Sequence, residues 1–192
     1  MNKYIVAGDK LLAFNAKCCT SSFIREIVRT YYPDIEQLIS TAAYPEGKSA
    51  DNTQHHNFVT YRVNPDRPVV LLVRDPVERF RSAMAQHNLT AEDVDGVLDE
   101  LRDETTNYVQ RLRAPKLAAN VHFLPQDRFA GDVSYFRAPD QIAEAAAALG
   151  IAVPGVINES EAGSKPDLTA EQIDRVRSWY ADDVALWESL NV

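Results

Sequence analysis

The stretch that decides the fold runs from Pro68 to Ser82 and reads PVVLLVRDPVERFRS. Its first half is uncharged and β-branched, which is typical of a buried strand of a parallel sheet. The strand is expected to end at Arg74, and Pro76 suits the first turn of the helix that follows. Ligands of open α/β sheets bind where strands end and helices begin. Arg74 therefore lies where a site is expected, and its planar guanidinium matches phosphate or sulfate.

A second strand-to-helix junction lies near the N-terminus. Leu11–Asn15 reads as a strand, and a helix is expected from Thr20 to about Tyr32. The residues at the junction are Lys17, Cys18, Cys19, Thr20, Ser21 and Ser22. A helix N-terminus attracts anions, small side chains let a phosphate approach the backbone, and hydroxyl groups add donors. Ser and Thr are also ordinary helix caps, so the composition of the junction alone fits either use.

The two junctions, in this order, resemble the nucleotide-binding segments of sulfotransferases that use 3′-phosphoadenosine-5′-phosphosulfate (PAPS). The sequence Arg-Asp-Pro-x-x-Arg, with Ser82 eight residues after Arg74, is similar to their 3′-phosphate-binding segment. The loop at residues 17–22 is similar to their 5′-phosphosulfate loop, although it lacks the glycines of a Walker P-loop.

Two later segments bring the resemblance closest to the carbohydrate sulfotransferases of the uronyl 2-O and chondroitin type. Asn120–Gln126, NVHFLPQ, is similar to their His-aromatic-x-Pro-Gln element. Residues 157–183 are similar to a C-terminal run in which N-x-S is followed by Lys165 and then by Y-x-x-D, here Tyr180 to Asp183. The four signals extend from about Leu11 to Trp187.

The resemblance implies a fold, an activity and a set of site residues. The expected fold is a single α/β domain over residues 1–192, with a central, mostly parallel sheet flanked by helices, as in P-loop-kinase-like sulfotransferases. The expected reaction moves a sulfuryl group from PAPS to an acceptor hydroxyl, which we expect to belong to a sugar. It leaves 3′,5′-bisphosphoadenosine (PAP) and uses no metal ion.

Roles follow residue by residue from the same resemblance. Lys17 would neutralise charge on the leaving oxygen, and residues 18–22 would hold the 5′-phosphate. Arg74 and Ser82 would hold the 3′-phosphate, which distinguishes this donor from ATP. Lys165 either closes over the nucleotide or is a solvated loop charge.

The acceptor hydroxyl needs a base, and histidine is the usual choice at neutral pH. The chain has four histidines, His55, His56, His87 and His122. Related uronyl 2-O-sulfotransferases carry catalytic histidines in a His-x-His-x-x-Tyr stretch. Here Phe58 stands at the second of those positions, so His56 is the first candidate, His55 the second, and a carboxylate of residues 44–54 the third. We interpret His87 as a C-terminal helix cap and His122 as a substrate or structural contact.

Composition limits the partners. The chain has 192 residues, of which 45% are hydrophobic and 25% charged, and a net charge of −8. The acidic balance opposes nucleic acid and long, highly sulfated polysaccharides as partners. No apolar run approaches the roughly 20 residues of a membrane span, and no secretory signal pattern is present, so a soluble, cytoplasmic protein is expected. The adjacent Cys18 and Cys19 suit neither a disulfide framework nor a zinc site.

The sequence also predicts the other elements. We expect an N-terminal hairpin, helices over 34–43, 76–87, about 90–113, 139–149 and 169–190, and strands over 58–63, 121–124 and 133–136. Thr90–Asp93 resembles a capping box, Thr169 is expected to cap the last helix, and Gly150 to end the one before it.

Two rival functions remain. Cys19 and Arg25 fit the Cys-x5-Arg pattern of low-molecular-weight phosphatases, although Phe23 and Ile24 lie where backbone donors should converge on a phosphate. A non-catalytic nucleotide- or sugar-binding module on the same fold is the other, and it stays open because Phe58 stands where a catalytic histidine is expected. The sequence indicates neither the acceptor's identity nor the oligomeric state.

Overall fold

The computed structural model describes residues 4–13, 15, 18–34, 60–61, 67–102, 123, 125–127, 129, 132–155 and 165–190. The chain forms two compact units, and each takes two segments of the sequence. The first unit comprises residues 1–73 and 128–157, and the second comprises residues 74–127 and 158–192. Because both units are discontinuous in the chain, no single linker separates them.

The first unit is built on a five-stranded sheet with the order β3-β1-β2-β4-β5. Its elements are β1 (Tyr4–Ala7), β2 (Lys10–Ala13), α1 (Thr20–Tyr31), β3 (Thr60–Tyr61), β4 (Val69–Arg74), β5 (Val133–Ala138) and α7 (Ile142–Leu149). Strand β1 pairs antiparallel with both β2 and β3, whereas β2 pairs parallel with β4. The α/β class and the hairpin are confirmed.

The expectation of a mostly parallel sheet is wrong, because the sheet is mixed. Gly8 and Asp9 are the only residues between β1 and β2, and so tight a turn can join only antiparallel neighbours. Gly8 has a φ of 62°, in the left-handed region that glycine adopts without a steric cost.

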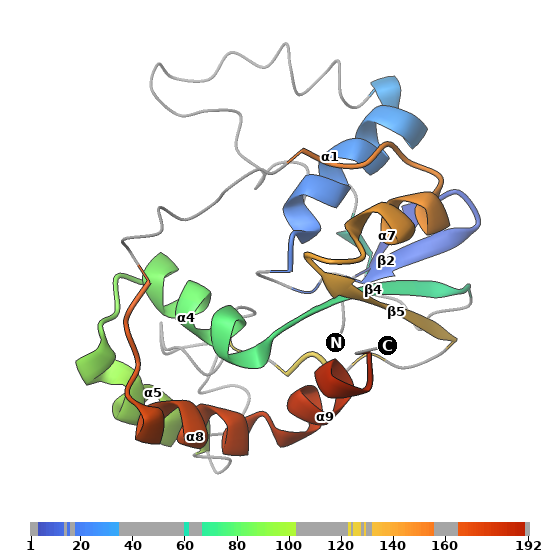
Figure 1. Cartoon of the computed structure of the whole chain (residues 1–192). Coiled ribbons are helices and arrows are strands. Elements are labelled where there is room, and N and C mark those ends of the chain that lie inside the picture. Colours follow the sequence, from blue (N-terminus) through green and yellow to red (C-terminus); the bar gives the residue numbers. More distant parts are fainter. Residues whose placement is uncertain are drawn as a thin grey trace, which may run out of the picture. The chain divides into compact units, whose positions relative to one another are not determined.

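The core of the first unit lies between the sheet and the helices α1 and α7, which Figure 1 shows together on one face of it. Alternate strand residues face these helices, among them Ile5 and Ala7 of β1 and Val70 and Leu72 of β4. Helix α1 contributes Phe23, Ile24, Ile27 and Val28, which are fully buried. Their spacing puts them on one stripe of the helix, so burial of this stripe fixes how α1 lies on the sheet.

The second unit is helical. It comprises α4 (Pro76–Gln86), the 3₁₀ helix η1 (Ala91–Asp93), α5 (Val94–Arg102), α8 (Ala170–Trp179) and α9 (Ala181–Ser189). Phe80 of α4 is central to its core and packs edge-to-face on Phe123 and Tyr180, with ring centroids 5.6 and 6.3 Å apart. Edge-to-face pairs of this kind add about 0.5–1.5 kcal/mol each to the burial of the rings.

Most helix boundaries agree with the sequence, with three differences. The capping boxes at Thr90 and Thr169 are confirmed, although the first opens a 3₁₀ turn before α5. Helix α7 starts at Ile142 and ends at Gly150, which has a φ of 66°. The last helix is not continuous, because it breaks at Tyr180 into α8 and α9.

At the break, the Tyr180 hydroxyl donates a 2.7 Å hydrogen bond to the carbonyl of Phe123. Three predicted segments lie outside the described residues: the helix 34–43 apart from Asp34, the strand 121–124 apart from Phe123, and the acidic helix beyond residue 102. Phe123 itself lies in a turn. None of the helices described is both long and apolar enough to cross a membrane.

Candidate anion-binding site

The N-terminus of α4 is capped by the side chain of the residue that precedes the helix. Asp75 is the N-cap, and its carboxylate accepts a 2.8 Å hydrogen bond from the backbone N–H of Glu78. Pro76 follows at the first helical position, where its missing N–H does no harm. Because a carboxylate already occupies this helix N-terminus, an anion bound at the junction would depend on cationic side chains.

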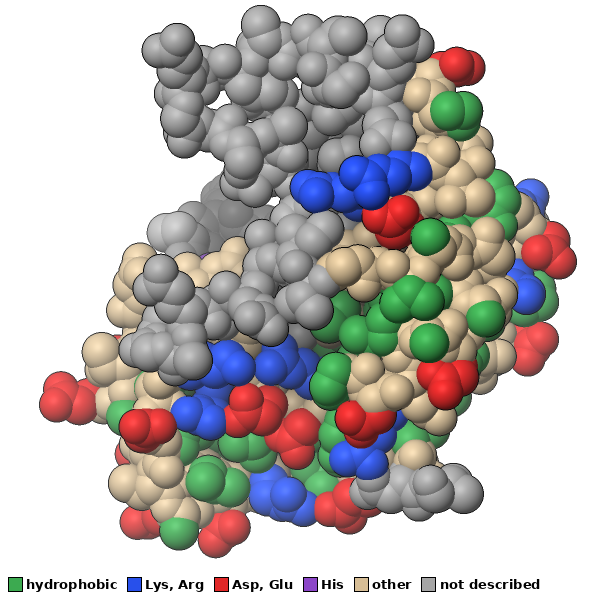
Figure 2. Space-filling model, turned by 45° about the horizontal axis from the view of Figure 1, so that its top comes forward, with side chains coloured by type: hydrophobic (Ala, Val, Ile, Leu, Met, Phe, Trp, Pro, Cys, Tyr) green, Lys and Arg blue, Asp and Glu red, His purple; other side chains and the backbone are tan. Residues whose placement is uncertain are grey.

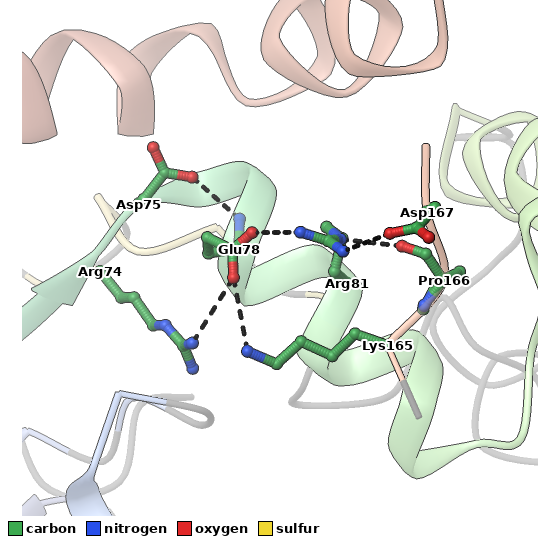
Figure 3. Close-up of polar contacts among 7 residues, drawn as sticks. All are labelled: Arg74, Asp75, Glu78, Arg81, Lys165, Pro166 and Asp167. Carbon is green, nitrogen blue, oxygen red and sulfur yellow. Dashed lines mark hydrogen bonds and ion pairs between the residues drawn. The ribbon is translucent and has the colours of Figure 1, made fainter. Parts of the chain in front are cut away.

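Three cations gather around one carboxylate beside this helix start. Glu78 Oε2 lies 3.4 Å from Lys165 Nζ and 4.0 Å from Arg74 Nη2. Glu78 Oε1 lies 2.6 Å from Arg81 Nη1 (Figure 3). We call these four residues, Arg74, Glu78, Arg81 and Lys165, the basic cluster. Two of its cations, Arg74 and Lys165, point at the same carboxylate oxygen.

Arg81 explains why Lys165 lies here. Its Nε donates to the carbonyl of Pro166 at 2.8 Å, and its Nη2 lies 3.1 Å from a carboxylate oxygen of Asp167 (Figure 3). The planar guanidinium thus holds Glu78 of α4 and the segment that precedes α8 at the same time. Lys165 is the residue before this anchored segment, so its amine is carried to the cluster.

The electrostatics of the cluster favour negative charge. Burial alone would raise the pKa of Glu78, but the hydrogen bond and charge of Arg81 and the charge of Lys165 hold that pKa below its ordinary value. The side chains of Arg74 and Lys165 are 24% and 21% exposed, so both are partly desolvated. On the face drawn in Figure 2, basic side chains lie against acidic ones.

Ser82 is the other residue predicted to meet the 3′-phosphate. It lies four residues after Glu78 on α4, so both lie on one side of the helix, one turn apart. Ser82 is buried, with 4% of its surface exposed. The second unit thus brings Arg74 and Lys165 to Glu78, whereas Ser82 is buried one turn further along α4.

The backbone of Arg74 is hydrogen-bonded to the side chain of Gln126. The Arg74 N–H donates to Gln126 Oε1 at 2.9 Å, and Gln126 Nε2 donates to the Arg74 carbonyl at 2.8 Å. The N–H of Gln126 donates to both oxygens of Asp183, at 2.7 and 2.9 Å. The two C-terminal segments that resemble sulfotransferases are therefore in contact. Tyr180 is hydrogen-bonded to Phe123 and Asp183 to Gln126, and each pair is 57 residues apart in the sequence.

The N-terminal junction belongs to the first unit and forms a tight turn into α1. Cys19 is the N-cap and adopts a left-handed conformation with a φ of 60°, which costs roughly 1–2 kcal/mol for a residue with a Cβ. The N–H groups of Ser22 and Phe23 both donate to its carbonyl, at 3.0 and 3.3 Å. Asn15 fastens the turn to β4, because its Nδ2 donates to the Leu72 carbonyl at 2.8 Å.

Most side chains predicted to bind the 5′-phosphate face inward. Cys18, Thr20 and Ser22 are buried, and the Thr20 hydroxyl donates to the carbonyl of Asn15. Cys19 is exposed. Of the predicted ligands here, Lys17 and the side chain of Ser21 lie outside the described residues. A phosphate at this turn would therefore not meet the inward-facing hydroxyl groups of Thr20 and Ser22.

The same helix bears on the phosphatase pattern. Residues 20–25, which would have to wrap around a phosphate in a Cys-x5-Arg loop, are the first six residues of α1. Because these residues are helical, their N–H groups point along the helix axis and do not form the loop around a phosphate that this pattern needs.

The candidate bases lie outside the described residues, namely His55, His56 and the carboxylates of residues 44–54. The same holds for Phe58 and His122. His87 is the C-cap of α4, as predicted, and its ring centroid lies 5.8 Å from that of Phe123. Sequence reasoning missed Glu78 as the centre of the basic cluster, although its spacing from Arg81 was visible.

Comparisons of this chain with protein-family models, with curated proteins and with solved structures found no match. The resemblance to sulfotransferases therefore stays a prediction.

Proposed function

We propose that this protein transfers a sulfuryl group from PAPS to an acceptor hydroxyl, which we expect to be on a sugar. The observation that carries the proposal is the convergence of Arg74 and Lys165 on one carboxylate oxygen, with Ser82 one turn further along α4. Two cations directed at one point suit a terminal phosphate dianion. In PAPS, that group is the 3′-phosphate.

In the proposed reaction, the acceptor oxygen attacks sulfur in line with the bond to the 5′-phosphate. That sulfur–oxygen bond breaks, and PAP leaves with the bonding electrons. Lys17 neutralises the charge that grows on the leaving oxygen, and His56 takes the acceptor proton. Little covalent chemistry falls to the protein, so positioning and charge stabilisation carry most of the rate.

Lys165 belongs to the nucleotide site in this proposal. Its amine lies 3.4 Å from Glu78 and is held there through Arg81, with its side chain 21% exposed. These contacts favour the role of nucleotide contact over that of a solvated loop charge.

The helical state of residues 20–25 favours the sulfotransferase over the phosphatase.

Calorimetry with PAP and with 5′-AMP tests the nucleotide assignment. PAP should bind more tightly, because loss of a charge-assisted contact costs about 1.5–3 kcal/mol, or roughly 10- to 150-fold in affinity. Arg74→Ala should remove most of this preference, whereas Arg177→Ala, which breaks an exposed ion pair with Glu188, should leave it. Equal affinity of the unmodified protein for both nucleotides would overturn the proposal.

Turnover separates the enzyme from the binding module. Incubation with PAPS and a panel of sugars should release PAP in step with a sulfated product. Preference for PAP without any release, across sugars, phenols and simple alcohols, would favour the non-catalytic module.

A further inference from the structure

We infer that Gln126 is a positioning residue for Arg74, and that Asp183 holds Gln126 in place for this task. The inference rests on the proposed function, since it concerns how Arg74 is aimed at the 3′-phosphate. It adds two residues, from two distant parts of the chain, that would set the preference for a bisphosphorylated nucleotide.

The contact of Gln126 with Arg74 fixes the backbone from which the Arg74 side chain extends. In an extended chain the N–H and C=O of one residue point to the same side, and the primary amide of Gln126 meets both, at 2.9 and 2.8 Å. The amide thus does what a neighbouring strand would do. With both backbone groups of Arg74 fixed, its Cα–Cβ bond has one direction, and the side chain starts toward Glu78 and Lys165.

Chemistry explains why glutamine suits this position. The site needs a donor and an acceptor side by side on one planar group, and only Asn and Gln provide both without charge. The Gln126 side chain is fully buried, so neither bond is weakened by exchange with water. A glutamate would put an acceptor against the Arg74 carbonyl, and a methionine would leave both backbone groups without this partner.

Asp183 fixes the glutamine in turn. Its carboxylate accepts from the N–H of Gln126 at 2.7 and 2.9 Å and from the N–H of Asp127 at 2.9 Å. The residue is 1% exposed and lies on the first turn of α9. Burial raises its pKa, against the opposing effects of the two N–H groups and of the buried cation Arg79. Burying a carboxylate costs free energy, and here its hydrogen bonds to the N–H groups of Gln126 and Asp127 hold the turn at these two residues in one position.

The test compares PAP with 5′-AMP in three variants. Gln126→Met and Gln126→Glu should each bind PAP about 5- to 20-fold more weakly while their affinity for 5′-AMP changes less than twofold. Asp183→Asn, which keeps one oxygen for the N–H groups, should shift the ratio in the same direction by about two- to fivefold. It serves as the second variant if the changes at Gln126 prevent folding.

Gln172→Met is the matched control. Gln172 also joins two elements, since it completes the Thr169 capping box and its Nε2 donates to the Ala91 carbonyl at 2.7 Å. This variant should lose stability without changing the ratio of the two affinities. If the Gln126 variants fold and keep the ratio of the unmodified protein, the inference is wrong. If the unmodified protein itself shows no preference for PAP, the proposed function fails instead.

Discussion

Glu78→Gln should tighten the binding of PAP. Glu78 shares its Oε2 with Lys165 and Arg74, at 3.4 and 4.0 Å, so its charge competes with that of an incoming phosphate. Gln is of the same size and keeps an oxygen for Arg81, while the negative charge is removed. The change therefore isolates electrostatic competition from packing.

The magnitude follows from Coulomb's law. A phosphate between Arg74 and Lys165 would lie about 5 Å from Glu78, where two unit charges repel by roughly 0.8 kcal/mol at the dielectric constant of water. That value suits a side chain 39% exposed. A phosphate dianion doubles it to about 1.6 kcal/mol. Looser anchoring of the cations would subtract about 0.5 kcal/mol, which leaves roughly 1 kcal/mol, or about fivefold tighter binding.

Calorimetry with PAP at about 50 mM salt and again at about 500 mM would measure the effect, which screening should reduce at the higher salt. Glu188→Gln is the control, because it removes the same charge from an ion pair of the same 2.6 Å length with Arg177. It should leave PAP binding unchanged. Weaker binding of PAP by Glu78→Gln would mean that Glu78 orients the cations more than it competes with the ligand, and the reasoning would be wrong.

Four further predictions concern stability and turnover. The pKa of Glu78 is lowered in the folded state, so the ionised carboxylate stabilises the fold. Glu78→Gln should therefore lower the free energy of unfolding by a constant amount above about pH 4.3, and this difference should disappear as the pH falls through the folded-state pKa. Urea unfolding across this pH range measures the difference. Tyr180→Phe leaves a buried carbonyl without its 2.7 Å donor and should cost about 1–2 kcal/mol of unfolding free energy, against less than about 0.5 kcal/mol for Tyr135→Phe, which changes a half-buried tyrosine of β5. Cys19→Gly should preserve stability or raise it by up to about 1 kcal/mol, whereas the β-branched Cys19→Val should lower it, since the φ is 60°. His56→Ala should slow sulfuryl transfer about 10²- to 10⁴-fold while PAP binding persists, and unchanged turnover would move the base to His55 or to a carboxylate of residues 44–54.

The local elements were predictable from the sequence because their signals are local. The apolar run before Arg74 specifies a buried strand, and Asp75 with Pro76 specifies the start of α4. Thr90 and Thr169 mark helix starts through bonds that reach only three residues along the chain. Each of these features depends on backbone preference or on near neighbours, so the amino-acid sequence by itself determines it.

The site was predictable only in part. The sequence identified Arg74 at a strand end and left two roles open for Lys165. Their common partner Glu78 is 87 residues from Lys165, and no periodicity reports a contact over that distance. The inward orientation of Thr20 and Ser22 was also missed, because a hydroxyl that caps a turn and one that binds a phosphate have the same sequence signature.

The sequence by itself determined where strands and helices begin and that Arg74 follows a buried strand. Only the tertiary structure decided what surrounds Arg74. Gln126 and Asp183 stand 57 residues apart, and packing of α4, α8 and α9 around Phe80 and Tyr180 brings them together. Hydrophobic burial is not directional, whereas the hydrogen bonds that aim a side chain are. The pattern of apolar residues therefore predicts that a core forms, and the folded chain alone shows which polar groups meet beside it.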